Sequence, residues 1–117
     1  MSEKPSDNFV VLVNKEGMGH AAPDLQIKLL ATYLRLLLEN GTLPKAICFY
    51  TEAVKLVVEG SPVLELLQQL ESRGVHLIIC QTCLNFYNLR EKVKAGIVGG
   101  MGDILAAQML ASKVITL

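Results

Sequence analysis

Tryptophan does not occur in this sequence of 117 residues, aromatic residues make up only 5% of it and charged residues only 19%. Eleven acidic residues balance eleven basic ones, so the chain lacks the surplus positive charge with which proteins bind nucleic acid. Long apolar runs are also lacking, because polar side chains recur between Lys28 and Glu39 in the longest candidate helix, whereas a membrane span needs about 18 apolar residues. We therefore expect neither nucleic acid nor a membrane among the partners of this protein.

Cysteine is scarce too. Cys48, Cys80 and Cys83 are few and odd in number, which does not fit a secreted disulfide framework. The first eight residues are polar and lack the apolar stretch of a signal peptide. These features predict a cytoplasmic protein with reduced thiols, in which a Cys-x-x-Cys pair serves redox, sulfur or metal chemistry.

Short apolar runs alternate with helical patterns along residues 8–117, which we expect to fold as one domain after a flexible tail over residues 1–7. The predicted strands are residues 9–13, 45–50, 75–80, 95–98 and 113–117. The predicted helices are residues 23–39, 62–73, 83–94 and 103–112, with a short amphipathic piece at 53–59. Strict alternation of strand and helix predicts an α/β domain with a parallel sheet and right-handed crossovers.

Helix boundaries carry their own signals. Gly41 predicts the end of the helix 23–39, whose leucine-rich stripes we expect to be packing surface. Ser61-Pro62 predicts the start of the next helix, with Gly74 as its C-cap.

The feature that most favours chemistry is Cys80-Gln81-Thr82-Cys83. Cys80 is predicted to end a strand and Cys83 to open a helix, and ligands of parallel sheets gather at the carboxyl ends of the strands. A helix N-terminus also favours the thiolate and so lowers the pKa of a thiol. The alternative is that both cysteines are small buried hydrophobic residues, as Cys48 in mid-strand is expected to be.

Three uses of such a pair compete. The first is dithiol–disulfide exchange, and the second is zinc binding, which needs about four ligands. Since the chain offers for zinc only the three cysteines, His20 and His76, we expect no metal and no cofactor. The third use is a persulfide carrier, which needs one activated thiol in a sheltered cleft. We expect Cys80 to be the most reactive thiol and Cys48 to be inert.

Two glycine-rich loops follow predicted strands. One contains Gly17, Gly19 and His20, and the other contains Gly100 and Met101. Such loops can cradle an anion with backbone N–H groups, and they are equally typical of simple tight turns. His20 could reach the thiols or point into solvent, whereas His76, inside a strand, is expected to be a core histidine.

The sequence resembles the DsrE/DsrF-like family, and most closely the C-terminal domain of YedF-type selenium-metabolism proteins. The resemblance depends on the cysteine element, on a loop before the second helix and on a turn near the fourth strand: residues 77–87 with Leu89 and Lys92; Val54-Lys55-Leu56 with Glu59-Gly60-Ser61; and Val98, Met101, Asp103 and Ile104. In the YedF-type pattern, however, Gln81 is a glycine, and Gly99, Gly100 and Gly102 are Ser, Asn and Tyr.

The resemblance implies a three-layer α/β/α domain whose five-stranded parallel sheet has the order 4-3-2-1-5. It implies a homo-oligomer (dimer, trimer or hexamer), and the 51% hydrophobic content also favours burial between subunits. It further implies a persulfide on Cys80, with sulfur-donor and sulfur-acceptor proteins as partners. A sulfur-carrier domain with a Cys-Pro-x-Pro motif, which YedF-type proteins carry, is expected to be supplied in trans.

The spacing of the pair makes Cys83 a candidate resolving thiol, because two intervening residues allow the sulfurs to come within disulfide range. Gln81 and Thr82, Gly17, Gly19 and His20, and Gly100 and Met101 are the candidate binding residues around the pair. Sulfur or selenium relay is the leading hypothesis. The alternatives are a non-catalytic small-ligand-binding or assembly module and a Cys-x-x-Cys thiol–disulfide redox protein.

Overall fold

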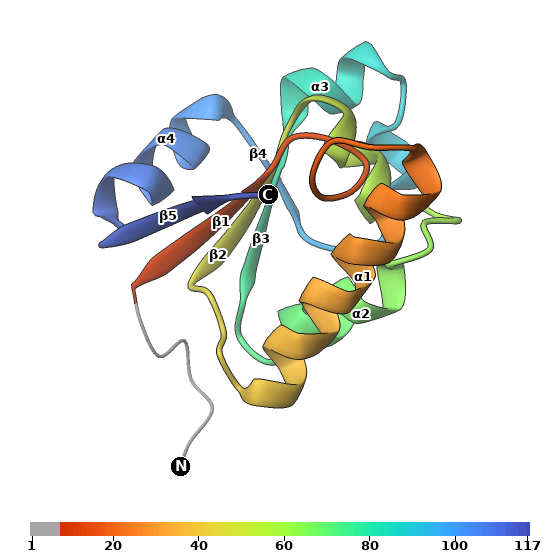
Figure 1. The fold of residues 1–117 in the computed structure, drawn as a ribbon. Helices are drawn as coiled ribbons and strands as arrows, with labels where there is room; N and C mark the ends of the chain where they lie inside the picture. The colour runs from red at the N-terminus through yellow and green to blue at the C-terminus, as the bar shows by residue number, and fades with distance from the viewer. Residues whose placement is uncertain (1–7) are drawn as a thin grey trace.

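The computed structural model describes residues 8–117, so the expected tail over residues 1–7 lies outside the described residues. These residues form a five-stranded, all-parallel sheet in the order β4-β3-β2-β1-β5 (Figure 1). The strands are β1 (Phe9–Val13), β2 (Ala46–Phe49), β3 (His76–Cys80), β4 (Ile97–Gly99) and β5 (Lys113–Thr116). The expected fold class and strand order are confirmed.

Helices cover the two faces of the sheet unequally. The α-helices are α1 (Pro23–Asn40), α2 (Leu64–Ser72), α3 (Gln81–Phe86) and α4 (Met101–Leu110), and the 3-10 helices are η1 (Thr51–Val57) and η2 (Arg90–Lys92). Figure 1 shows α1 and α2 on one face, α4 on the opposite face, and the short α3 beyond the carboxyl ends of the strands. None of the helices in residues 8–117 is long and apolar enough to cross a membrane.

The core lies mainly between the sheet and the helices α1 and α2. Every residue of β1 and β2 is buried, which is why these strands are continuous apolar runs instead of alternating ones. Leu30, Leu34 and Leu37 are the buried residues of α1, whereas Leu25, Leu29 and Leu36 remain exposed. The expectation that all the leucine stripes of this helix are packing surface is therefore wrong for the outer stripe in the isolated chain.

The predicted helix 83–94 is wrong in extent, because the chain breaks it into α3 and η2. Asn88 adopts a left-handed conformation, with φ of 58°, and the Leu89 N–H donates to the Leu84 carbonyl at 2.9 Å. Asparagine tolerates this conformation because its short polar side chain can bond locally, so it ends the helix as glycine often does.

Two helix starts also differ from expectation. Helix α2 begins at Leu64 instead of Pro62, and the Ser61 hydroxyl accepts a hydrogen bond from the Val63 N–H at 3.2 Å ahead of the helix. Helix α4 begins two residues earlier than predicted, because Gly100 acts as its N-cap and the Gly100 N–H donates to Asp103 Oδ2 at 2.9 Å. At the end of α1, Gly41 has φ of 67° and is the predicted cap.

Candidate functional site

The two cysteines of the Cys-x-x-Cys element meet at the carboxyl end of β3. Cys80 is the last residue of the strand and the N-cap of α3, so the helix starts at Gln81 and Cys83 lies in its first turn. The Cys83 Sγ donates a hydrogen bond to the Cys80 Sγ across 3.1 Å. The structure thus brings the predicted pair into direct contact, with both thiols free.

The two thiols differ in their access to solvent. Cys80 is only 2% exposed, whereas Cys83 is half-buried and lines a shallow hollow of about 280 Å³ together with Thr51, Thr82, Phe86 and Tyr87. Access to solvent therefore favours Cys83 as the first thiol to meet a bulky reagent, which is opposite to the expected ranking of reactivity.

The expectation that a helix start lowers the pKa of the thiol is wrong for Cys83. Burial, followed by the hydrogen bond to Cys80, raises the pKa of Cys83 above its ordinary value. A backbone N–H from Thr51, 3.0 Å from the sulfur, acts in the opposite direction and lowers this pKa. The start of the short helix α3 does not offset the cost of charging a partly buried sulfur that also hydrogen-bonds to a second thiol.

Thr51 is a site residue that the sequence reasoning missed. It is the first residue of η1, two residues after the end of β2, and its φ of 52° is left-handed. The neighbouring Lys55 lies with its Nζ 4.5 Å from the centroid of the Tyr87 ring, which holds η1 against α3. The available signal was topological: neighbouring parallel strands end at the same edge of a sheet, so the residues after β2 had to lie beside Cys80.

Gln81 and Thr82, candidate binding residues, lie exposed beside the pair, and Thr82 lines the same hollow as Cys83. The loop with Gly17, Gly19 and His20 does not line this hollow. A Cβ at Gly17 would lie 2.5 Å from the Gln26 Cβ, so that glycine allows the loop to pack closely against α1. These contacts therefore favour a tight turn over an anion-binding loop at this position.

Gly100 and Met101 begin α4 and also lie outside the hollow beside Cys83. Cys48 is fully buried in β2, as expected, and burial raises its pKa to about 11. His76 is exposed, so its expected place in the core is wrong. It points to the sheet face that α4 covers only in part.

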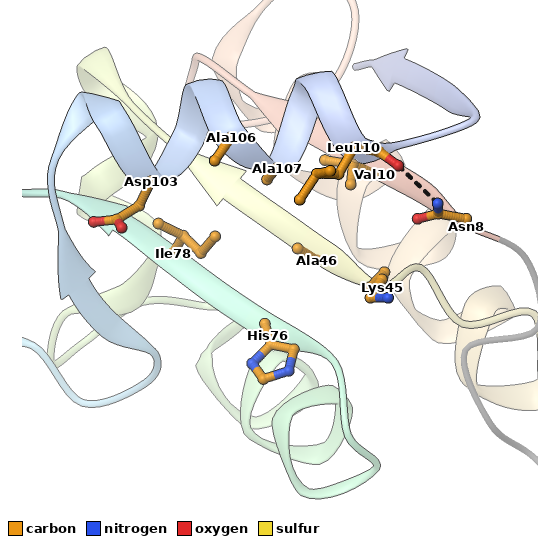
Figure 2. A pocket seen from close by; sticks show the side chains of 10 residues that line it. All are labelled: Asn8, Val10, Lys45, Ala46, His76, Ile78, Asp103, Ala106, Ala107 and Leu110. Carbon is orange, nitrogen blue, oxygen red and sulfur yellow. Dashed lines mark hydrogen bonds between the residues drawn. The ribbon is translucent and has the colours of Figure 1, made fainter.

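A larger hollow lies on that face, between α4 and the sheet, with a volume of about 500 Å³ (Figure 2). We call it the α4 groove. It is lined by Asn8, Val10, Lys45, Ala46, His76, Ile78, Asp103, Ala106, Ala107 and Leu110. Figure 2 shows Asp103 near the start of α4 and Lys45 near its end, so the two ends of the groove carry opposite charges. Asn8 closes the second end, because its Nδ2 donates to the Leu110 carbonyl at 2.7 Å.

Metal ligands do not converge in this part of the chain: among residues 8–117, no group of three or more His, Cys, Asp or Glu side chains could hold an ion. The groups gathered at the cysteine pair are thiols, backbone N–H groups and aromatic rings, which suit thiol chemistry.

A parallel sheet of order 4-3-2-1-5 with a cysteine at the end of its third strand defines an α/β protein with a thiol site at the carboxyl edge. The sequence profile of the DsrE/DsrF-like family matches residues 8–117, so the chain belongs to this family. No curated protein sequence matches the chain. The closer likeness to YedF-type proteins stays a prediction.

Two solved structures share the fold. One is the YchN protein of E. coli, with a TM-score of 0.70 and 16% identity over 95% of this chain and 99% of that chain. The other is MTH1491 of Methanobacterium thermoautotrophicum, a protein of unknown function, with a TM-score of 0.70 and 17% identity over 93% of this chain and 97% of that chain. At these identities the likeness establishes the fold alone.

Proposed function

We propose that this protein is a sulfur-relay carrier that holds a sulfane sulfur as a persulfide on Cys80, with Cys83 as its resolving thiol. The observation that carries the proposal is the contact of the two sulfurs, 3.1 Å apart at the carboxyl edge of the sheet. Membership of the DsrE/DsrF-like family supports a role in sulfur relay. The likeness to YedF-type proteins supports selenium as an alternative cargo.

The chemistry requires no cofactor. In loading, the Cys80 thiolate attacks the outer sulfur of a donor persulfide, the S–S bond of the donor breaks, and the donor leaves as a thiolate. In release to an acceptor, a nucleophile of the acceptor takes the outer sulfur and Cys80 becomes a thiolate again. Both steps are redox-neutral, so donor and acceptor proteins are the partners that this carrier needs.

Burial of Cys80 suits storage. A persulfide on a sulfur that is only 2% exposed is shielded from oxidants and from competing thiols, which attack accessible sulfurs first. The cytoplasm, a reducing compartment, keeps both thiols available between cycles.

Mass spectrometry after incubation with a small persulfide donor tests the proposal. We expect an adduct of about 32 Da, one sulfur atom, on the peptide that contains Cys80. Because Cys83 of the parent can convert a Cys80 persulfide into the Cys80–Cys83 disulfide, the deciding protein is Cys83→Ser. If this variant never gains the mass of one sulfur, while the parent cycles between dithiol and disulfide, the protein is a redox protein and the carrier proposal fails.

A second candidate function, assembly through a second copy of this chain, is favoured by the surface of α4. Large apolar side chains are exposed along this helix and beside it: Met101, Leu105, Met109, Leu110, Ile97 and Val114. Of these, Met109 is 73% and Leu110 76% exposed, and Leu110 also lines the α4 groove. Large exposed apolar side chains gathered on one helix and the strands beside it are typical of an interface.

The charges at the ends of the α4 groove favour a second copy as its occupant. In a two-fold arrangement with the α4 grooves antiparallel, a contact between residues i and j occurs twice, so Asp103 of each copy can approach Lys45 of the other. Light scattering tests this at micromolar concentration, where we expect a mass at least twice the 12.8 kDa of one chain. A mass of one chain would overturn the assembly proposal and leave the carrier proposal intact.

A further inference from the structure

Thr51 has a backbone conformation that its side chain disfavours. Its φ of 52° places it in the left-handed region, where a β-branched residue is a genuine outlier. The strained residue lies against the cysteine pair, and strained residues that surrounding structure holds in place cluster at functional sites. The position of the strain therefore links the conformation of Thr51 to the two thiols.

Hydrogen bonds to two strand ends hold Thr51 in this conformation. Its Oγ1 lies 2.5 Å from the Asn14 carbonyl oxygen, after β1, and 2.6 Å from the Tyr50 carbonyl oxygen, after β2. The hydroxyl has one proton and donates it to either carbonyl. The side chain thus ties the first turn of η1 to the end of the central strands.

The backbone N–H of Thr51 is consequently available to the sulfur. The first N–H groups of a helix have no partner within that helix, and Thr51 is the first residue of η1. This N–H donates to the Cys83 Sγ at 3.0 Å, across 32 positions of sequence. Burial and the Cys80 thiol raise the pKa of Cys83, and the Thr51 N–H is the contact that lowers it.

We propose that Thr51 is a positioning residue of the cysteine pair, whose left-handed backbone aims its N–H at Cys83 and holds the Cys83 thiolate ready to resolve the persulfide on Cys80. This role rests on the proposed function. In the resolving step the Cys83 thiolate, having lost its proton to water, attacks the Cys80 Sγ. A Cys80–Cys83 disulfide bond forms, the bond to the outer sulfur breaks, and that sulfur leaves with the electron pair as HS⁻. The Cys83 sulfur is oxidised and the outer sulfur is reduced, and an external dithiol then reduces the disulfide.

Titration of the parent protein tests the contact without any substitution at Thr51. An amide proton that donates to a sulfur moves downfield when that sulfur becomes a thiolate. We expect the Thr51 amide proton to titrate by NMR with the same midpoint as the alkylation rate of Cys83, and to lose this response in Cys83→Ser. A Thr51 amide that does not respond to Cys83 ionisation overturns the proposal.

Two substitutions at Thr51 separate positioning from mere turn formation. Thr51→Gly keeps the N–H and adopts left-handed backbone readily, so we expect its Cys83 alkylation profile to match the parent within about twofold. Thr51→Val loses the hydroxyl and resists positive φ, so its midpoint should rise by about one pH unit, which means alkylation about tenfold slower at neutral pH. The Cys80 persulfide of Thr51→Val should also persist about tenfold longer, because resolution needs the Cys83 thiolate.

These results distinguish the two proposals. If the amide titrates with Cys83 but no persulfide ever forms, the proposed function fails and the contact to the thiolate stands. If Thr51→Val folds and has the parent's alkylation profile, the positioning role fails whatever the protein carries. If Thr51→Val does not fold, the NMR titration of the parent alone decides.

Discussion

The carboxyl edge of the sheet and the α4 groove are built on different principles. At the edge, the chain turns sharply out of β2 and β3, and those turns place a strained threonine and two sulfurs in contact. In the groove, small alanines and apolar side chains of the sheet and α4 leave a hollow with opposite charges at its ends. The thiols and the residue beside them lie where the backbone turns out of the sheet, whereas the proposed assembly surface lies on a sheet face that one helix covers incompletely.

The largest expected effect belongs to the edge. Cys80→Ser should abolish the sulfur adduct of about 32 Da, because the carrying sulfur is gone. Cys83→Ser should keep the adduct and lengthen its lifetime about tenfold, because the internal release route through the disulfide is lost. Mass spectrometry over time after removal of the donor measures both.

Neither serine variant should change the assembly state, since both cysteines lie outside the α4 groove. If Cys83→Ser loses the adduct while Cys80→Ser keeps it, the roles of the two cysteines are reversed. That outcome would fit the greater exposure of Cys83. It would also refute the assignment of the persulfide to Cys80, which follows from the family resemblance.

The matching experiment on the proposed assembly surface replaces the exposed Leu105 and Met109 of α4 by lysine. Both side chains are exposed, so the folded chain tolerates the charges, but a second copy covering α4 would bury them. We expect the affinity between copies to fall at least about 100-fold, with the adduct on Cys80 unchanged. Gln69→Lys, at an exposed position of α2, adds a charge away from the groove and should leave the assembly intact, as measured by light scattering.

The parts of the structure that could be predicted from the sequence are those with a local signal. Continuous apolar runs and their alternation with helical patterns sufficed for β1, β2 and the parallel sheet, because burial on both faces leaves a simple signal. The cysteine pair was visible because its Cys-x-x-Cys spacing lies at the end of a predicted strand.

What could not be predicted depends on tertiary structure. Nothing local in Tyr50-Thr51 indicates a left-handed threonine, since its conformation follows from carbonyls at the ends of two strands that come together only on folding. His76 was expected in the core because its strand is apolar, and it is exposed because α4 leaves that part of the sheet uncovered. The helix 83–94 was overextended because its stop is an asparagine instead of a glycine.

A smaller effect is expected from Cys48, the sulfur of the central strand β2, which differs from the pair at the edge in being fully buried. Burial raises the pKa of Cys48 from 9.0 to about 11, so the folded state favours the neutral thiol. Its contribution to stability is complete below about pH 9 and is lost as the pH rises toward 11, because only the unfolded chain releases the proton over that range. Between about pH 8 and about pH 10 we expect the free energy of unfolding to fall by about 1.3 kcal/mol from this group.

Urea unfolding of the parent and of Cys48→Ala at both pH values measures that contribution. Other groups titrate equally in both proteins, so the difference between the two pH dependences isolates Cys48. If the free energy of unfolding of Cys48→Ala falls as much between the two pH values as that of the parent, this thiol is not sheltered in β2.

The smallest effect concerns Gly99, where the two regions touch. Gly99 pairs with Cys80 in the sheet, and a Cβ built on it would lie 2.8 Å from Asp103 Oδ2, the atom that accepts the Gly100 N–H at the start of α4. Gly99→Ala should therefore turn this carboxylate away and cost about 1 kcal/mol of stability through the lost cap, as measured by urea unfolding. Gly102→Ala is the matched control: its added Cβ meets no atom within 4 Å, and alanine inside α4 should stabilise by about 0.5–1 kcal/mol. Because Asp103 is also the acidic end of the α4 groove, Gly99→Ala should weaken the assembly while the Cys80 adduct persists. A variant that shortens the lifetime of the adduct as much as it weakens assembly would show that the edge and the groove act as one site.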